Sequence, residues 1–311
     1  MSDKDQEKHL EKFVTDEEKK AEPIVGSGLV DTSTVNKPWE KDEISLGNKI
    51  GWVPLPIKDL PTTGLFYPDN AEIAIKPALT TEIRHWSTLE ETNYSNLDSM
   101  LNYILERCAT YKTSGPYSSW KDICEVDRFY ILLAIREISF VTGENQLQVK
   151  ISETKKIDVT KDMVDFINFG DELMKYYDST KKCFNLKFKS GKAIEVFIPT
   201  VGVTQFLKNY FNRKQALEES IDADYMPYAP FLIKDWRGLS DSSYENYVLE
   251  SNSWSKEEIS VLSYVKDLFA ETINPVIRYI DDGGAEKFSP VNFQGGIKSL
   301  FLISNPLGQL V

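Results

Sequence analysis

The sequence is poor in the residues that most often bind metals or act as nucleophiles. Among its 311 residues there are three cysteines and two histidines, and no Cys-x-x-Cys pair occurs. A structural zinc site takes about four nitrogen, sulfur or oxygen ligands at recognisable spacing, which this set does not provide. No nucleophile-elbow motif lies near His85, the one histidine outside the charged N-terminal region. We therefore predict no catalytic residues, no metal site and no cofactor.

Disulfide bonds are not expected either. Cys108, Cys124 and Cys183 are odd in number and far apart, and the N-terminus is charged where a secretory signal would be apolar. These features are typical of reduced thiols in a cytoplasm. Cys108 and Cys124 fall in or beside the apolar phase of expected helices, so we interpret them as small buried hydrophobic residues.

Long apolar runs and an excess of positive charge are also missing. No stretch approaches the roughly 18 apolar residues of a membrane-spanning helix, and a net charge of −12 opposes a phosphate-binding surface. We predict no membrane association and no nucleic-acid binding. One lysine group fits the solvated face of a hairpin better than a nucleic-acid site. It comprises Lys181, Lys182, Lys187 and Lys189.

The composition that remains is that of a globular protein with a charged N-terminal region. Apolar residues make up 41% and aromatic residues 12%, enough to fill a core. Residues 1–47 are charge-dense without a sustained apolar period, and we predict a disordered acidic tail. Residues 48–159 are expected to hold an extended element, helices and a strand pair. Residues 160–311 are expected to form a mixed helix and hairpin region with C-terminal strands, and one continuous domain with the preceding part stays an alternative.

The most distinctive element lies at residues 52–79. Its prolines exclude a helix, because each fixes φ and removes a backbone donor. We expect a turn at Thr63-Gly64, an apolar run from Leu65 to Tyr67, and a strand with Ile73 and Ile75 on one face. Few groups able to do chemistry occur in this element, which points to assembly. The prolines are Pro54, Pro56, Pro61 and Pro68.

A helix from a capping serine (118 or 119) to about Phe140 is predicted to lie at the centre. Asp122 stands at the capping-box position, and the run Phe129–Ile135 is apolar almost all round. Such a helix spans about 33 Å. Asp127 and Arg136 border the apolar run, and we interpret them as members of structural ion pairs, because an unpaired buried charge costs several kcal/mol.

The other expected elements complete an α+β fold: a helical core with an extended N-terminal proline-rich hairpin element and short antiparallel strand pairs. Alternation around Ser190-Gly191 is typical of a hairpin, and Ser255 with Glu258 forms a capping box. The remaining elements are a short helix at 80–89, a stronger helix at 97–108, a strand pair at 147–151 and 157–159, a helix over 160–180 interrupted near Gly170, a helix from Thr204 to about Glu219, and an ordered loop at 222–243.

Two aromatic or proline-rich segments are the predicted partner-binding surfaces, because aromatic residues often dominate protein interfaces. Packing of both segments inside the chain itself is an equal alternative. The predicted residues are Leu65, Phe66, Tyr67, Tyr225, Tyr228, Phe231 and Trp236.

The order of several segments over about residues 50–305 resembles one family. The segments are Leu60-Pro61-x-x-Gly64-Leu-Phe-Tyr-Pro68, Ala71-Glu72-Ile73-x-Ile75-x-Pro77-Ala78-Leu79, the helix from Asp127-Arg128 to Ile135-Arg136, the Ser190-Gly191 hairpin ending in Pro199-Thr200, and the C-terminal Gly284-Ala285-Glu286, Val291-Asn292-Phe293 and Leu300-Phe301. Together they look like the baseplate hub subunit and hub assembly family of T-even-like contractile-tailed bacteriophages.

This resemblance implies a structural or assembly component of the tail baseplate hub that acts by protein–protein contacts. Its partners would be other phage tail and baseplate proteins, and its location the virion after assembly in the host cytoplasm, with oligomerisation left open. Paired cysteines of the family are absent here, so no metal site is carried over. One alternative is a transient hub assembly chaperone absent from the mature virion. A second is a carboxylate-dependent hydrolase using Glu90-Glu91, Glu218-Glu219 or Asp281-Asp282.

Overall fold

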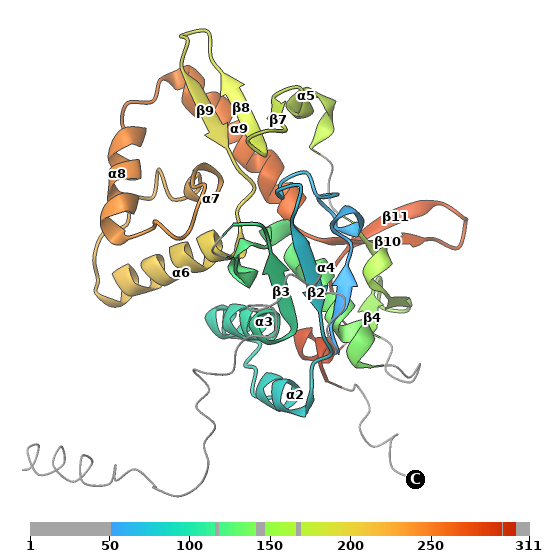
Figure 1. The fold of residues 1–311 in the computed structure, drawn as a ribbon. Helices are drawn as coiled ribbons and strands as arrows, with labels where there is room; N and C mark the ends of the chain where they lie inside the picture. Colours follow the sequence, from blue (N-terminus) through green and yellow to red (C-terminus); the bar gives the residue numbers. More distant parts are fainter. Residues whose placement is uncertain (1–50, 116–117, 141–146, 166–168, 294, 303–311) are drawn as a thin grey trace, which may run out of the picture. The chain divides into compact units, whose positions relative to one another are not determined.

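The computed structural model describes residues 51–115, 118–140, 147–165, 169–293 and 295–302 (Figure 1). These residues belong to the second of two compact units, residues 45–311. The predicted acidic tail over residues 1–47 lies outside the described residues. Helices and small antiparallel sheets alternate along the described ranges. The α+β fold class predicted from the sequence is confirmed.

The proline-rich segment forms one edge of a three-stranded antiparallel sheet in the order β1–β2–β3. Pro54 lies in the edge strand, where a missing N–H is tolerated. Ile73 and Ile75 are buried on one face of β2, as predicted, and Ala74 on the other face is buried too. The sheet is therefore covered on both sides at this strand. Its strands are β1 (Val53–Leu55), β2 (Glu72–Ile75) and β3 (Ala109–Lys112).

The loop between β1 and β2 turns at Thr63 and Gly64, as predicted. Both residues have a positive φ, 50° and 81°, the left-handed region that favours glycine. A Cβ at Gly64 would lie 2.9 Å from the side chain of Ile57, which belongs to the 3₁₀ helix η2 (Ile57–Asp59). The loop thus folds back onto its own beginning, and this position has no room for a side chain.

Helix α4 (Glu125–Ser139) lies at the centre of the hydrophobic core. Every residue from Tyr130 to Arg136 is buried, so the prediction of a central helix is confirmed. Its 15 residues span about 22 Å at 1.5 Å per residue, which is shorter than the predicted 33 Å.

The predicted start of this helix is wrong by several residues. The capping box of Ser119 and Asp122 forms, but it closes only the single turn η3 (Trp120–Asp122). Cys124 is extended and bridges to Thr200, with the N–H of Glu125 donating to the Pro199 carbonyl at 2.9 Å. Pairing with a distant segment therefore replaces the first predicted turns of the helix.

Two of the predicted strand pairs are confirmed. The first is the antiparallel pair β4–β5, and the second is the hairpin around Ser190-Gly191, to which a third short strand adds in the order β7–β8–β9. The strands are β4 (Leu147–Lys150), β5 (Lys156–Val159), β7 (Tyr177–Asp178), β8 (Cys183–Lys187) and β9 (Ala193–Val196).

The predicted helix over residues 160–180 is wrong. The described part of this segment forms four short elements, because β6 pairs with β10 and β7 pairs with β8. Long-range pairing thus overrides local helix propensity. The elements are η5 (Lys161–Met163), β6 (Val164–Asp165), α5 (Gly170–Met174) and β7, and the sheet β11–β10–β6 also contains β10 (Val276–Ile280) and β11 (Glu286–Pro290).

The predicted helices elsewhere form with shifted ends. Thr200 caps α6 (Val201–Ala216), which therefore begins before Thr204, and the capping box of Ser255 and Glu258 starts α9 as predicted. A helix that the sequence did not predict, α8, begins inside the expected loop at 222–243. The other helices are α2 (Thr80–Trp86), α3 (Tyr94–Cys108), α7 (Ala229–Leu232), α8 (Asp241–Ser251), α9 (Lys256–Ile273) and η6 (Ile297–Leu300).

Among the described residues, the buried side chains form two hydrophobic clusters. The larger cluster surrounds α4 and takes residues from both predicted regions, 48–159 and 160–311. The smaller lies between α6, α7 and α8, which gather on one side of the ribbon (Figure 1). Leu232 and Trp254 pack against both clusters, so the two are continuous.

Candidate functional site

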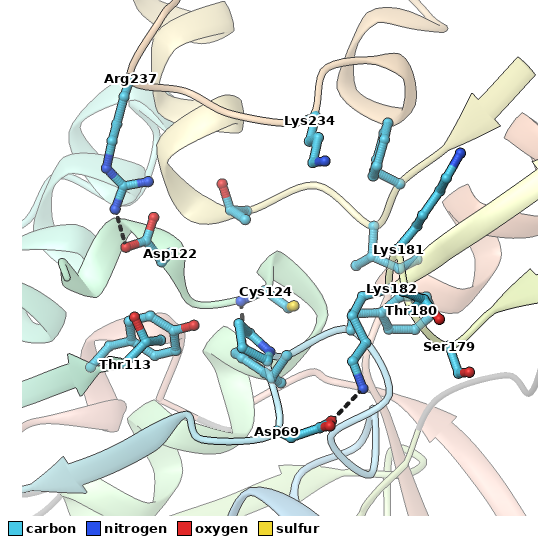
Figure 2. A pocket seen from close by; sticks show the side chains of 17 residues that line it. Asp69, Thr113, Asp122, Cys124, Ser179, Thr180, Lys181, Lys182, Lys234 and Arg237 are labelled. Carbon is cyan, nitrogen blue, oxygen red and sulfur yellow. Dashed lines mark hydrogen bonds and ion pairs between the residues drawn. The ribbon is translucent and has the colours of Figure 1, made fainter. Parts of the chain in front are cut away.

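A basin of about 830 Å³ lies where five separate segments of the chain meet. Figure 2 shows side chains from the Phe66–Asp69 loop, the β3 to α4 region, the β7–β8 turn, the strand leading to Thr200, and the segment after α7. The lining residues are spread from Phe66 to Arg237, so the basin forms only when the chain is folded.

The charges around the basin largely neutralise one another. The Lys182 ammonium lies 2.7 Å from the Asp69 carboxylate, which holds the pKa of Asp69 below its usual value. Arg237 pairs with Asp122, and Figure 2 draws both of these pairs. Lys234 is exposed and has no ion-pair partner within the described ranges. The basin can therefore accept a polar or weakly anionic surface.

The thiol in the basin is not an activated nucleophile. Cys124 is buried, and burial raises the pKa of its thiol well above the usual value, with the nearby Asp127 carboxylate acting in the same direction. A reactive cysteine needs a lowered pKa, because the thiolate is the nucleophile. This fits the prediction of Cys108 and Cys124 as buried hydrophobic residues, and all three cysteines are in fact free and buried.

Beneath the basin, a buried carboxylate ties the proline-rich loop to helix α4. Asp127 is fully buried and accepts three hydrogen bonds: from the Thr62 N–H at 3.0 Å, the Thr62 hydroxyl at 2.7 Å and the Tyr67 hydroxyl at 2.8 Å. The Tyr67 hydroxyl in turn accepts from the Cys124 N–H at 3.0 Å. The proline-rich loop and the start of α4 are thus fixed to each other through one aspartate.

Burial dominates the ionisation of this network. Loss of water raises the pKa of Asp127 to about 6, although its hydrogen bonds from Thr62 and Tyr67 lower it in part. Burial also raises the pKa of the Tyr67 hydroxyl well above its usual value, so it donates as a neutral phenol. The predicted ion pair of Asp127 is wrong: its partners are hydroxyls and a backbone N–H, and no salt bridge to it occurs among the described residues.

Arg136 anchors the other end of α4. Its guanidinium donates to the Leu300 carbonyl at 2.8 Å and lies over the Phe140 ring at 4.8 Å. Burial lowers the pKa of this group to about 10. The helix is therefore tied at its start to the proline-rich loop and at its end to the C-terminal segment.

The first predicted partner-binding group lies mostly inside the protein. Tyr67 is 2% exposed, and its hydroxyl belongs to the aspartate network. Phe66 is half-buried against Phe184, with ring centroids 5.7 Å apart. Leu65 is half-buried, and its carbonyl accepts from the Tyr177 hydroxyl. These contacts match the alternative of packing inside the chain, and contact of the half-buried residues with a partner stays a prediction.

The second predicted group is also held by contacts within the chain. Tyr225 and Phe231 are buried, in the smaller and larger clusters respectively. Tyr228 is half-buried, with its hydroxyl 2.7 Å from that of Ser263, and Trp236 is half-buried with its indole N–H donating to Asp122 at 2.8 Å.

An aromatic cluster joins the two predicted groups. Phe66 packs against Phe184, Phe184 against Phe269, and Phe269 against Phe231, with ring centroids between 5.2 and 5.7 Å apart. The structure thus brings the two segments to one interior cluster. Sequence pattern did not indicate this meeting, because the segments are more than 150 residues apart.

The acids of the hydrolase alternative do not gather in the basin. Glu91 accepts from the backbone N–H of Lys298 at 2.7 Å, and Asp281 accepts from the N–H groups of Gly283 and Ala285 in a turn. No group of three or more histidine, cysteine, aspartate and glutamate side chains suited to a metal ion occurs in the described ranges. None of the helices in those ranges combines the length and apolar character needed to cross a bilayer.

Sequence reasoning missed two exposed aromatic residues that border apolar surface. Tyr176 is 49% exposed and Tyr264 is 65% exposed. For Tyr264 a signal was present, because Leu262, Val265 and Phe269 mark the buried stripe of α9 and Tyr264 lies off it. The basin residues Lys234 and Arg237 had no comparable signal.

Comparisons with known proteins add no relative to this description. No family model matches the chain, and no curated protein and no solved structure matches it either.

Proposed function

We propose that the protein is a structural or assembly component of the baseplate hub of a contractile phage tail and acts through protein–protein contacts. The observation that carries this proposal is that the segments resembling the hub family hold one another in place. Tyr67 bonds to Asp127 and to the Cys124 N–H, and Cys124 pairs with Thr200. Arg136 bonds to Leu300.

The interlocked segments favour a scaffold because their polar groups face one another. Asp127 is fully buried, and each of its hydrogen bonds positions a loop or a helix end. A catalytic carboxylate has to reach a substrate, whereas a buried, fully bonded one contributes rigidity. A rigid frame of this kind suits a protein whose task is to present a surface in fixed geometry.

The proposed partners are other tail and baseplate proteins, met in the host cytoplasm and retained in the virion. Affinity purification of the tagged full chain from infected cells, followed by peptide identification, tests this. We expect tail proteins to be enriched at least several-fold over a tag-only control. Purification without any tail protein would contradict the proposal.

The chaperone alternative has the same contacts but a different fate. Mass spectrometry of purified particles separates the two, because a hub component is retained at constant stoichiometry and a chaperone is lost. Detection in assembly intermediates but not in finished particles would favour the chaperone.

A further inference from the structure

An apolar groove of about 260 Å³ lies between α5, the end of β8 and the first half of α9. These three elements lie close together in Figure 1. We call it the tyrosine groove and define it by Leu173, Tyr176, Phe188, Val261, Tyr264 and Val265. It is distinct from the basin, and none of the partner-binding residues predicted from the sequence lines it.

The groove has a buried apolar floor and exposed aromatic walls. Leu173, Phe188 and Val265 are buried, while Tyr176 and Tyr264 are 49% and 65% exposed. Neither tyrosine hydroxyl has a hydrogen-bond partner in the described part of the chain. Tyrosine is enriched at interfaces because its ring supplies apolar area and its hydroxyl a polar contact. The site is therefore built to receive an apolar group from outside.

Charges on the rim indicate what accompanies that apolar group. Lys187 and Lys189 lie on the strand side, both exposed and without an ion-pair partner among the described residues. Two carboxylates also line the groove: Glu172 on the α5 side is paired with Lys175 at 2.5 Å, and Glu257 lies exposed on the α9 side. The two unpaired lysines on the strand side therefore favour a partner with negative charge at this position.

We propose that the tyrosine groove binds a segment of a partner protein that inserts an apolar side chain and places acidic residues against Lys187 and Lys189. This proposal rests on the proposed function in one respect, namely that the chain binds another protein. The basin is a weaker candidate for such binding, because two of its cations already pair with the acids that line it.

Photo-cross-linking tests the proposal in the full chain. Tyr264 is replaced by the photoreactive p-benzoylphenylalanine, which keeps an aromatic ring at an exposed position, and cross-linked peptides from infected cells are identified by mass spectrometry. We expect a peptide of another protein that carries an apolar residue next to aspartate or glutamate. The Lys187→Glu, Lys189→Glu double variant should lower its yield about fivefold, the effect of two partly screened charge contacts.

Two controls match these changes. The same photoreactive residue at Leu249, which is 66% exposed on α8, probes a site outside the groove. Lys234→Glu reverses an exposed, unpaired lysine of the basin. We expect no comparable adduct at position 249 and an unchanged yield at position 264 in the Lys234→Glu variant.

Several outcomes would overturn the proposal: no adduct, an adduct only with a second copy of this chain, a peptide without acidic residues, or equal yields at positions 264 and 249. The two proposals fail separately. An adduct of the expected chemistry with a protein that is not part of a phage tail would sink the proposed function and leave the groove. Purification with tail proteins but without an adduct would support the proposed function and contradict the proposal for the groove.

Discussion

Replacing Asp127 by asparagine should change how the stability of the protein depends on pH. The carboxyl group has a pKa of about 6 in the folded protein against an ordinary value of 3.8, because burial disfavours its charged form. Between these two values the folded state keeps the proton that the unfolded state has lost. The free energy of unfolding of the native protein therefore falls as pH rises through this window.

The expected size of the effect follows from the pKa difference. A shift of about two units corresponds to roughly 3 kcal/mol, at about 1.4 kcal/mol per unit. Asparagine has the same shape and does not titrate, and its amide oxygen can still accept from the Thr62 N–H. We expect the free energy of unfolding of Asp127→Asn, relative to the native protein, to rise by about 3 kcal/mol from pH 3.5 to pH 7.

Urea denaturation at several pH values, followed by tryptophan fluorescence, measures this difference. A difference that stays constant with pH, or that falls as pH rises, would refute the reasoning. Asp69→Asn is the matched control, because Lys182 lowers the pKa of Asp69 at an exposed position. The sign for the control is opposite, because the native Asp69 carboxylate contributes stability that is lost as pH falls. The free energy of unfolding of Asp69→Asn, relative to the native protein, should therefore fall as pH rises.

Three further predictions concern packing and thiols. Tyr67→Phe should lower the free energy of unfolding by about 2 kcal/mol in the same urea assay, because it leaves the buried Cys124 N–H without an acceptor and removes one of the three hydrogen bonds to Asp127; a loss below about 0.5 kcal/mol would contradict a role of the hydroxyl. Gly202→Ala should destabilise by about 1–3 kcal/mol, because its Cβ would lie 2.4 Å from the Trp236 ring, and an unchanged midpoint would contradict that contact. Native protein at pH 8 should show no reaction of its three thiols with Ellman's reagent, and unfolded protein should show all three, because each is buried; fast labelling of the native state would contradict this.

Elements with local signals were predicted well from the sequence. The capping box of Ser255 and Glu258 and the hairpin around Ser190-Gly191 formed as expected, because their hydrogen bonds join residues close in sequence. The all-apolar run of α4 correctly indicated a central helix. Burial of every face leaves few alternatives for such a segment.

Elements decided by distant partners were not predictable in this way. The segment 160–180 has helical periodicity, yet β6 pairs with β10 more than 100 residues away. The start of α4 depends on the bridge between Cys124 and Thr200. The residues around neither position indicate this pairing in the sequence.

The candidate sites show the same limit. Aromatic residues such as Phe66 and Phe231 were predicted on composition, and composition does not distinguish a docking surface from an interior cluster. The basin unites side chains from Asp69 to Arg237, so only the folded chain brings them together. Tyr264 was recognisable in principle, because its helix marks the buried stripe clearly.

The hydrogen bonds that join the 3₁₀ turn η6 to the N-terminal half of the chain have a consequence for folding during translation. The Trp86 indole N–H donates to the Lys298 carbonyl, Glu91 accepts from the Lys298 N–H, and Arg136 donates to the Leu300 carbonyl. Until this turn leaves the ribosomal exit tunnel, the Lys298 carbonyl cannot accept from Trp86 and the Leu300 carbonyl cannot accept from Arg136. We infer that compaction of the first 140 residues completes only after translation has passed position 300, and that shorter nascent chains expose sites for chaperone binding.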